Sequence, residues 1–203
     1  MKHHILEMPI TETQARALRV GDTATLETRL FGIRDATLIH MFDHGRTTRL
    51  DLNGHAVIHT APNVRKAEGY PANQPKYEPL CIGTTTSQRM ERFTKPLMAR
   101  EGVRLIIGKG GMGPQTLAAF RELGGAYLAV VGGAAALETT WIEAIEDVDL
   151  DDLHPESLWQ FRIKNFGPLL VTMDSHGGSL HRDVLENAAA KRAEILASIG
   201  AGK

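Results

Sequence analysis

The alternation of apolar and polar side chains predicts strands in the first part of the chain. Residues Thr23–Leu30 alternate polar with apolar side chains and end shortly before Arg34. His55–Thr60 is a second strand-like segment, and it follows an Asn53-Gly54 turn signal. Between the two, Asp35–Asp43 fits a short helix.

The pattern changes to a helical period after residue 84. Met90, Phe93, Leu97 and Met98 recur at offsets that put them on one face of a helix, and Gly102 would end that helix. The stretch therefore predicts an amphipathic helix with its apolar stripe toward a core.

A strand, a helix and a second strand follow in quick succession. Val103–Ile107 and Ala126–Val131 are short apolar strands, joined by the glycine-rich loop Gly108–Gly113 and the helix Pro114–Leu123. Such a unit predicts a parallel pair of strands with a right-handed crossover.

The remaining pattern completes a mixed α/β domain. Strand-like alternation in Ile142–Leu153 and Leu158–Phe166 precedes a further strand, Leu169–Met173, and residues 184–203 contain a C-terminal helix. Residues 66–79 hold several prolines among polar residues and predict a loop insertion, not a domain boundary. We therefore expect residues 1–203 to form one domain.

Composition narrows the classes of function. Of 203 residues, 42% are hydrophobic, and 23 Lys and Arg balance 24 Asp and Glu, which gives no reason to expect nucleic acid or an anionic membrane as partner. The longest nearly uncharged apolar run, Ala126–Leu137, is too short to span a bilayer, and the N-terminus lacks a secretory signal. The single cysteine, Cys81, cannot alone hold a zinc ion or an iron–sulfur cluster, so a reducing cytoplasm is expected.

Four segments that follow predicted strands carry residues suited to chemistry. They are Arg34-Asp35, Thr84–Arg89, Gly108–Gly113 and Asp174–Gly178. Since loops at the ends of sheet strands often meet in one crevice, we expect these segments to converge.

The cations of these segments suit a small di-acid. Arg34 and Arg89 can each donate two parallel hydrogen bonds to a carboxylate, and Lys109 adds a compact positive charge from within a glycine loop. The alternative for each arginine is an ordinary ion pair with a surface carboxylate, such as Arg34 with Asp35.

The glycine loop also permits a dinucleotide site. Gly108-x-Gly110-x-x-Gly113 matches the dinucleotide fingerprint, and a nicotinamide-dependent oxidoreductase is the alternative function. Against it, no acidic residue ends the next strand, and Pro114 removes one of the amides that a pyrophosphate would use.

Hydroxyl and imidazole groups add candidates. In the run Thr84-Thr-Thr-Ser87, Thr86 or Ser87 would cap the following helix, and the others are free to face a substrate. An unaided hydroxyl is too weak a base and needs activation. Of nine histidines, His59 and His176 stand at positions where a functional role is plausible.

These segments together resemble the beta subunit, or C-terminal domain, of the iron–sulfur hydro-lyases that comprise class I fumarases and L(+)-tartrate dehydratases. The resemblance spans nearly the whole chain. The most specific pieces are Gly83-Thr-Thr-Thr-Ser-Gln-Arg-Met90, Ile107-Gly-Lys-Gly-Gly-Met-Gly-Pro114, Gly132-Gly-Ala-Ala-Ala-Leu137 and Pro155-Glu-Ser-Leu-Trp159.

The resemblance implies a swivelling three-layer β/β/α domain with a mixed sheet. It also implies a heteromer in which a partner alpha subunit carries a four-iron four-sulfur cluster, with a homodimer as the state of the isolated chain. By resemblance, Arg34, Arg89 and Lys109 would bind the substrate carboxylates, Thr85 would be the proton-abstracting hydroxyl, and an open iron would act as Lewis acid.

Three positions depart from the family's usual motifs. Leu38 stands where the family has the histidine of Arg-Asp-x-x-His, Ala61 replaces the glycine of His-x-Gly-Pro, and Thr84 replaces the proline of Gly-Pro-Thr-Thr. The expected function is reversible loss of water from a hydroxy-dicarboxylate, L-tartrate or malate, in the cytoplasm. A non-catalytic dicarboxylate-binding paralogue is a further alternative.

Overall fold

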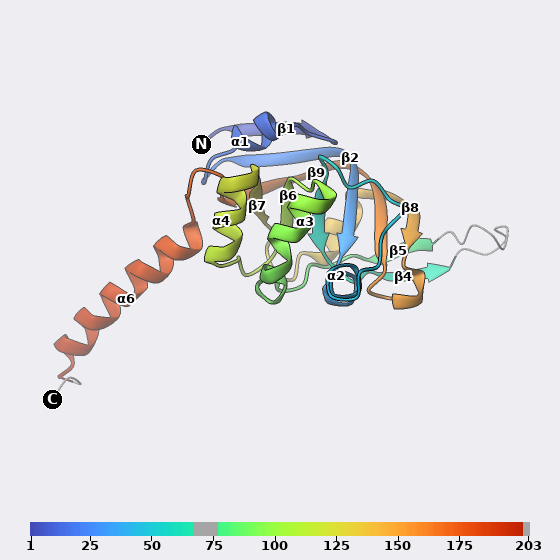
Figure 1. The fold of residues 1–203 in the computed structure, drawn as a ribbon. Helices are drawn as coiled ribbons and strands as arrows, with labels where there is room; N and C mark the ends of the chain where they lie inside the picture. Colours follow the sequence, from blue (N-terminus) through green and yellow to red (C-terminus); the bar gives the residue numbers. More distant parts are fainter. Residues whose placement is uncertain (67–76, 201–203) are drawn as a thin grey trace.

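One long sheet, closed on itself, organises the molecule. The structure is a computed structural model that describes residues 1–66 and 77–200. The strand order is β1-β2-β3-β6-β7-β9-β8, and β9 also pairs with β2 (Figure 1). The strands are β1 (His3–Glu7), β2 (Thr23–Ile33), β3 (Ala56–His59), β6 (Leu105–Gly108), β7 (Ala126–Ala129), β8 (Ile142–Asp149) and β9 (Leu158–Met173).

Strand direction explains how the sheet closes. β1, β2, β3, β6 and β7 are parallel to their neighbours, whereas β9 runs antiparallel to β7, β8 and β2. Because β9 bonds to β7 on one side and to β2 on the other, the strands β2, β3, β6, β7 and β9 form a closed, barrel-like ring. The expected mixed α/β class with a mixed sheet is confirmed.

Helices cover one side of this barrel. In Figure 1, α3 and α4 lie side by side over the sheet, and α6 extends away from the body. The helical elements are α1 (Glu12–Arg16), α2 (Asp35–Phe42), the 3₁₀ helix η1 (Ser87–Phe93), α3 (Thr94–Glu101), α4 (Pro114–Leu123), α5 (Ala135–Thr140), the 3₁₀ helix η2 (Asp151–Leu153) and α6 (Leu180–Ser198). A separate hairpin consists of β4 (Asn63–Lys66) and β5 (Tyr77–Cys81).

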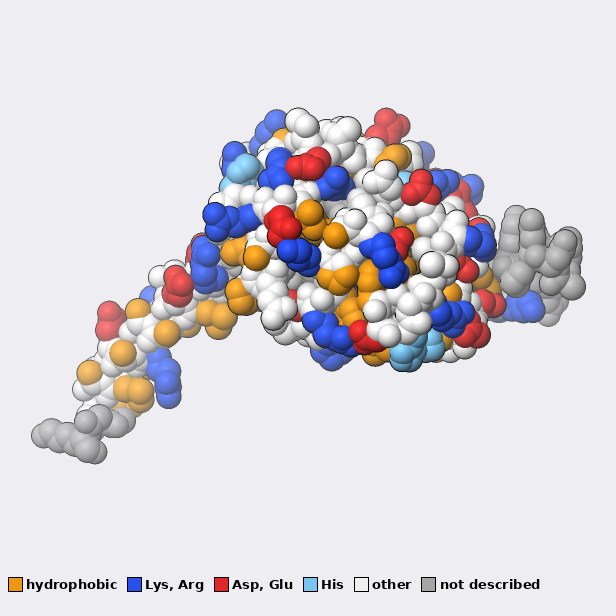
Figure 2. Space-filling model, viewed as in Figure 1, with side chains coloured by type: hydrophobic (Ala, Val, Ile, Leu, Met, Phe, Trp, Pro, Cys, Tyr) orange, Lys and Arg blue, Asp and Glu red, His pale blue; other side chains and the backbone are white. Residues whose placement is uncertain are grey.

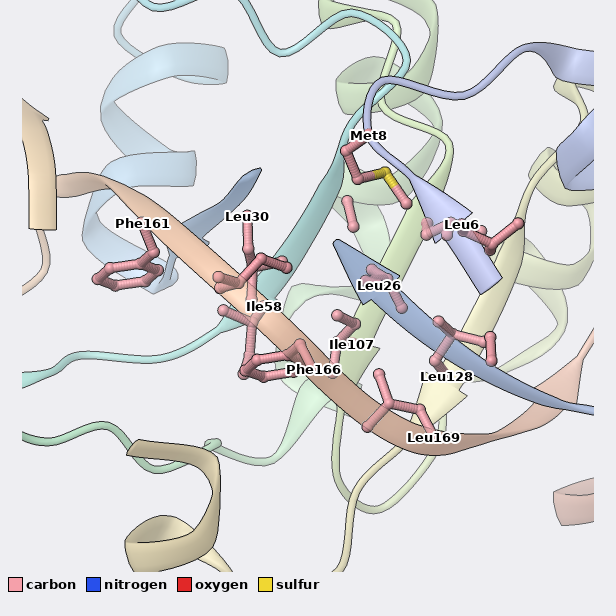
Figure 3. Close-up of a cluster of buried hydrophobic side chains, with 14 of the residues drawn as sticks. Leu6, Met8, Leu26, Leu30, Ile58, Ile107, Leu128, Phe161, Phe166 and Leu169 are labelled. Carbon is pink, nitrogen blue, oxygen red and sulfur yellow. The ribbon is translucent and has the colours of Figure 1, made fainter. Parts of the chain in front are cut away.

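Both faces of the central strands are buried. One hydrophobic cluster, drawn in Figure 3, includes Leu30 of β2 and Ile107 of β6. A second cluster, which includes Phe31 and Ile106 from the opposite faces of the same strands, contains buried side chains of α2, α3 and α4. The ends of β2, β3 and β6 are therefore held in place from two sides, so the loops that follow them start from rigid positions.

Most predicted elements are confirmed, but several of their bounds differ. The apolar stripe of Met90 to Met98 is buried as predicted and Gly102 ends it with a left-handed φ of 71°, but the stretch begins as the 3₁₀ helix η1 before α3. The predicted break between Leu158–Phe166 and Leu169–Met173 is wrong, because β9 continues through it as one strand. The pairing of β9 with both β2 and β7 supplies hydrogen bonds along its whole length.

The predicted loop at residues 66–79 is bounded differently. Lys66 is the last residue of β4, and Tyr77–Pro79 belong to β5; the rest of that segment lies outside the described residues. The C-terminal helix begins at Leu180, before the predicted boundary at residue 184. Within residues 1–66 and 77–200, no helix combines the length and apolarity needed to cross a bilayer.

Candidate functional site

Two of the predicted arginines meet at one carboxylate. Arg34 lies where β2 passes into α2, and Arg89 lies on η1. Asp35 accepts hydrogen bonds from Arg89 Nε at 3.3 Å and Nη2 at 2.9 Å, and from Arg34 Nε at 3.4 Å. The hydrogen bonds from Arg89 hold the pKa of the Asp35 carboxyl below its usual range. The ion-pair alternative for Arg34 and Asp35 is therefore correct, yet the pair also brings Arg89 to the same place.

Glu156 is a second carboxylate that contacts Arg34 and the start of α2. One oxygen accepts a hydrogen bond from the backbone N–H of Ala36 at 2.7 Å, in the first turn of α2, and the other lies 3.3 Å from Arg34 Nε. A carboxylate at a helix N-terminus is stabilised by the free N–H groups there. Sequence analysis gave Glu156 no role, although this residue belongs to the Pro-Glu-Ser-Leu-Trp motif.

The hydroxyl of Thr85 lies against Arg89. Arg89 Nη2 donates a hydrogen bond to Thr85 Oγ1 at 3.2 Å, and the Thr85 backbone N–H donates to the carbonyl of His59 at 2.8 Å. A cationic donor beside a hydroxyl favours its deprotonated form. Thr85 therefore has a cationic hydrogen-bond donor beside its hydroxyl.

Lys109 enters from the end of β6, next to the same segment. Its backbone forms a parallel bridge with Thr86, and its carbonyl accepts a hydrogen bond from the Ser87 N–H at 3.1 Å. An ideal Cβ on Gly132 would lie 3.5 Å from Lys109 Cδ, so the lysine stem runs past this glycine. Within the described part of the chain, the Lys109 ammonium has no hydrogen bond and no ion pair closer than 4 Å.

A buried hydrogen-bond chain supports the loop that carries Thr85 and Arg89. His59 Nδ1 lies 2.9 Å from Ser87 Oγ, and the hydroxyl of Tyr127 donates to the same oxygen at 2.9 Å. Burial lowers the pKa of His59 to about 4 and raises the pKa of Tyr127 to about 12. Both groups are therefore neutral near pH 7, and His59 acts here as a structural support with its ring away from solvent.

The predicted helix cap is wrong in its chemistry. Thr86 occupies the N-cap position of η1, but its side chain makes no capping hydrogen bond. Ser87 points inward to His59 and Tyr127 instead. A buried pair of hydrogen bonds outweighs a solvent-exposed cap in this case, since an unpaired imidazole or phenol in the core would be costly.

Glu138, on α5, is a functional candidate that sequence analysis missed. Its side chain is 1% exposed, and neither carboxylate oxygen has a hydrogen bond of good geometry among the described residues. Burial raises the pKa of its carboxyl, while the backbone and hydroxyl of Thr84 and the charge of Lys109 oppose that shift in part. A buried carboxyl with so little support calls for an explanation.

The fourth predicted segment does not join the others. The carboxylate of Asp174 accepts hydrogen bonds from the backbone N–H groups of Val20, His176 and Gly178, which fold the turn after β9. Since β9 is antiparallel to β7, this turn lies at the opposite end of the sheet from Lys109. His176 bonds to the carbonyl of Arg16 and takes no part in the site.

The departures from the family pattern fall in different places. Leu38 is 1% exposed and packs in the cluster under α2, so an apolar side chain fills that position. Ala61 is half-buried just after β3, and Thr84 contacts Glu138. In the described ranges no three His, Cys, Asp or Glu side chains are grouped to hold a metal, and Cys81 is exposed.

Comparison with known proteins identifies the family of the chain. The model of the Fumarase C-terminus family matches residues 1–184. The chain is 38% identical over 196 residues to the L(+)-tartrate dehydratase subunit beta of Escherichia coli K12, which covers 96% of this chain and 94% of that subunit. A protein of Methanocaldococcus jannaschii assigned as the same subunit is 32% identical over 192 residues, 92% of this chain and 95% of its own length.

A longer relative carries the same unit as one part of its chain. The protein of Geobacillus stearothermophilus assigned as a class I fumarate hydratase is 40% identical over 191 residues, which make up 94% of this chain but only 36% of that protein. The glycine loop Gly108–Gly113 falls within the residues that match the family model. By its sequence and across nearly its whole length, the chain belongs to the Fumarase C-terminus family.

Proposed function

We propose that this chain is the beta-type subunit of a hydro-lyase that reversibly removes water from a small hydroxy-dicarboxylate. One observation carries the proposal: Arg34 and Arg89 share Asp35, and Arg89 also donates to Thr85. The backbone of Lys109 bridges to the neighbouring Thr86, and its ammonium has no partner among the described residues. The names of the relatives, tartrate dehydratase beta subunit and class I fumarate hydratase, support L-tartrate or malate and fumarate as substrates.

The free faces of the arginines are available to a carboxylate. Arg34 uses only Nε in its contacts with Asp35 and Glu156, and Arg89 uses Nε and Nη2. The remaining guanidinium N–H groups can donate to a substrate, because each side chain is held in position by its acidic partner. Lys109 would then bind the second carboxylate.

The chemistry follows from this placement. Thr85 Oγ takes the proton from the carbon beside a substrate carboxylate, the C–H electrons form the new double bond, and the hydroxyl on the neighbouring carbon leaves with the electrons of its C–O bond. Charge moves onto the carboxylate during proton removal, where fixed cations stabilise the transition state more than the ground state. Arg89, which contacts Thr85 Oγ1, favours the deprotonated hydroxyl.

We also propose a division of labour between two subunits. The iron–sulfur cluster expected of this family does not fit the described residues of this chain, which offer one exposed cysteine and no grouped ligands, so we assign the cluster to an alpha subunit. In this division of labour the chain would act as a swivelling β/β/α domain. It would bring Arg34, Arg89 and Lys109 to the iron–sulfur cluster of the alpha subunit.

The test is reconstitution of the pair of subunits with a substitution at Lys109. The purified chain should show no dehydration of L-tartrate or malate alone and should gain it with the cluster-bearing subunit. In that complex, Lys109→Ala should lower kcat/KM by about 2–4 kcal/mol of transition-state stabilisation, because a charged contact to substrate is lost.

A matched control separates this loss from a general effect. Lys95→Ala removes an exposed lysine that pairs with Glu122 on α4, and it should change kcat/KM little. Unchanged kcat/KM in Lys109→Ala would contradict the assignment of Lys109. A complex that binds dicarboxylates but never turns them over would instead favour the non-catalytic paralogue.

A further inference from the structure

The buried carboxyl of Glu138 lies next to the one predicted cation that has no counter-ion. Its side chain is 1% exposed, and Lys109 is the charged residue whose field acts on it. Lys109 itself is half-buried and forms no ion pair within the described ranges. A buried carboxyl that feels the charge of an ammonium without a close salt bridge leaves the charge of the pair dependent on one proton.

Thr84 completes this arrangement. Its backbone N–H and its hydroxyl both approach the Glu138 carboxyl closely enough to favour the ionised form. Thr84 forms an antiparallel β-bridge with Thr60, but the hydrogen bond of that bridge is donated by the Thr85 N–H to the carbonyl of His59. The N–H of Thr84 is therefore available to Glu138. A proline at this position would have no N–H to donate. Thr84 and the buried Glu138 thus form one feature.

We propose that Glu138 is a positioning residue that sets the charge which Lys109 presents to a substrate carboxylate, so that binding of a dicarboxylate is coupled to proton uptake by Glu138. The proposal rests on Lys109 being the carboxylate-binding lysine of the proposed function. Ionised Glu138 offsets the ammonium and weakens its hold on an anion. Protonated Glu138 leaves the positive charge unopposed, and a bound anion in turn favours the protonated form.

Other titratable groups near α5 are engaged elsewhere. The helix packs on β5 and β8. Their acidic side chains are paired with arginines: Glu78 with Arg65, Glu143 and Glu146 with Arg162, Asp147 and Asp149 with Arg49. His59, the buried imidazole nearby in the site, has a pKa of about 4 and stays neutral above pH 5. Among the acidic side chains of α5, β5 and β8, Glu138 is therefore the one without a cationic partner within 4 Å in the described part of the chain.

A direct titration of the full chain tests the coupling. The carbon-13 carboxyl signal of Glu138, assigned by its absence in Glu138→Gln, would be followed from pH 5 to 9 with and without succinate, a dicarboxylate that has no hydroxyl to lose. In the unsubstituted chain succinate should raise the titration midpoint. Lys109→Met should raise the midpoint without succinate and remove the response to it. A midpoint that Lys109→Met leaves unmoved overturns the proposal.

Kinetics of the complex with its cluster-bearing subunit give a second, sign-specific result. Since Glu138→Gln keeps the shape but cannot ionise, at pH 8 it should lower KM by about three- to tenfold and flatten its rise with pH, with kcat little changed. A purely structural Glu138 predicts a higher or unchanged KM at every pH. Thr84→Val, which removes the hydroxyl that lowers the pKa of the Glu138 carboxyl, should move the pH dependence to higher pH.

The two proposals fail in different ways. If Lys109→Met binds succinate as tightly as the unsubstituted chain, the carboxylate site of the proposed function is wrong. If Lys109→Met loses binding while Glu138→Gln keeps the full pH dependence of KM, the site stands and the role of Glu138 is wrong.

Discussion

The charged residues of this site differ in whether an acidic neighbour balances their charge. Arg34 and Arg89 share Asp35, whereas Lys109 has no close counter-ion within the described residues. Sequence analysis identified all three cations because arginine and lysine at strand ends suit carboxylates. It did not identify Asp35 as their common partner, because only the fold brings η1 beside the start of α2. The same limit hid Glu138, whose burial has no signal in the sequence.

The pH dependence of stability should report on His59. Its pKa is about 4 in the folded chain and about 6.5 when exposed, so only the unfolded state takes up a proton between these values. The contribution of His59 to the free energy of unfolding should therefore be fully present above about pH 6.5. It should fall by roughly 3 kcal/mol as the pH is lowered toward 4. Urea unfolding from pH 4.5 to 7.5 measures this, and His59→Gln, which can still bond to Ser87, should show a shallower fall. Equal slopes in both proteins would contradict it.

The strands contribute to the site through the residues at their C-terminal ends. β2, β3 and β6 are short or central strands buried on both faces, and each places one functional segment where it stops: Arg34 after β2, His59 at the end of β3, and Lys109 after β6. Parallel strands bring these ends to one edge of the sheet. The fourth segment, after β9, fails to join them because β9 is antiparallel.

The junction between β6 and η1 should tolerate no added volume at Gly108. An ideal Cβ there would overlap Ser87 Oγ and lie 2.9 Å from the hydroxyl of Tyr127, whereas a Cβ on Gly132 meets only the lysine stem at 3.5 Å. Gly108→Ala should destabilise the chain by about 1–3 kcal/mol and lower activity by displacing the segment with Thr85. Gly132→Ala is the control and should fold normally. Chemical denaturation and assay of both variants decide the matter; equal stabilities would refute this packing argument.

At the scale of the whole molecule, α6 contributes little buried surface to the folded barrel. No residue of α6 is buried, and its exposed apolar side chains include Val184, Leu185 and Ile195. Figure 2 shows hydrophobic side chains among charged ones along the extended helix, while basic and acidic side chains are interspersed over the visible face of the body. The family match also ends at residue 184.

Removal of residues 184–203 should therefore leave the barrel intact. We expect the unfolding free energy in urea to change by about 0.5 kcal/mol or less, since no residue of α6 is buried. Leu97→Ala, which empties a fully buried position in α3, should cost about 2–5 kcal/mol and serves as the positive control. A loss of similar size on truncation would show that α6 packs on the body.

The sequence by itself determined the α/β class, the strand–helix–strand unit around Gly108–Gly113 and the family. It also indicated Arg34, Arg89 and Lys109 as candidate carboxylate-binding residues. Periodicity, glycine positions and motif order are local properties that can be seen without the fold. Closure of the sheet, the continuity of β9 and the grouping of Arg34 and Arg89 on Asp35 depended on contacts between residues far apart in the chain. Burial and counter-ions are likewise properties of the packed molecule, so only the tertiary structure decided which acidic and basic side chains neutralise one another and that Glu138 is left without a partner among the described residues.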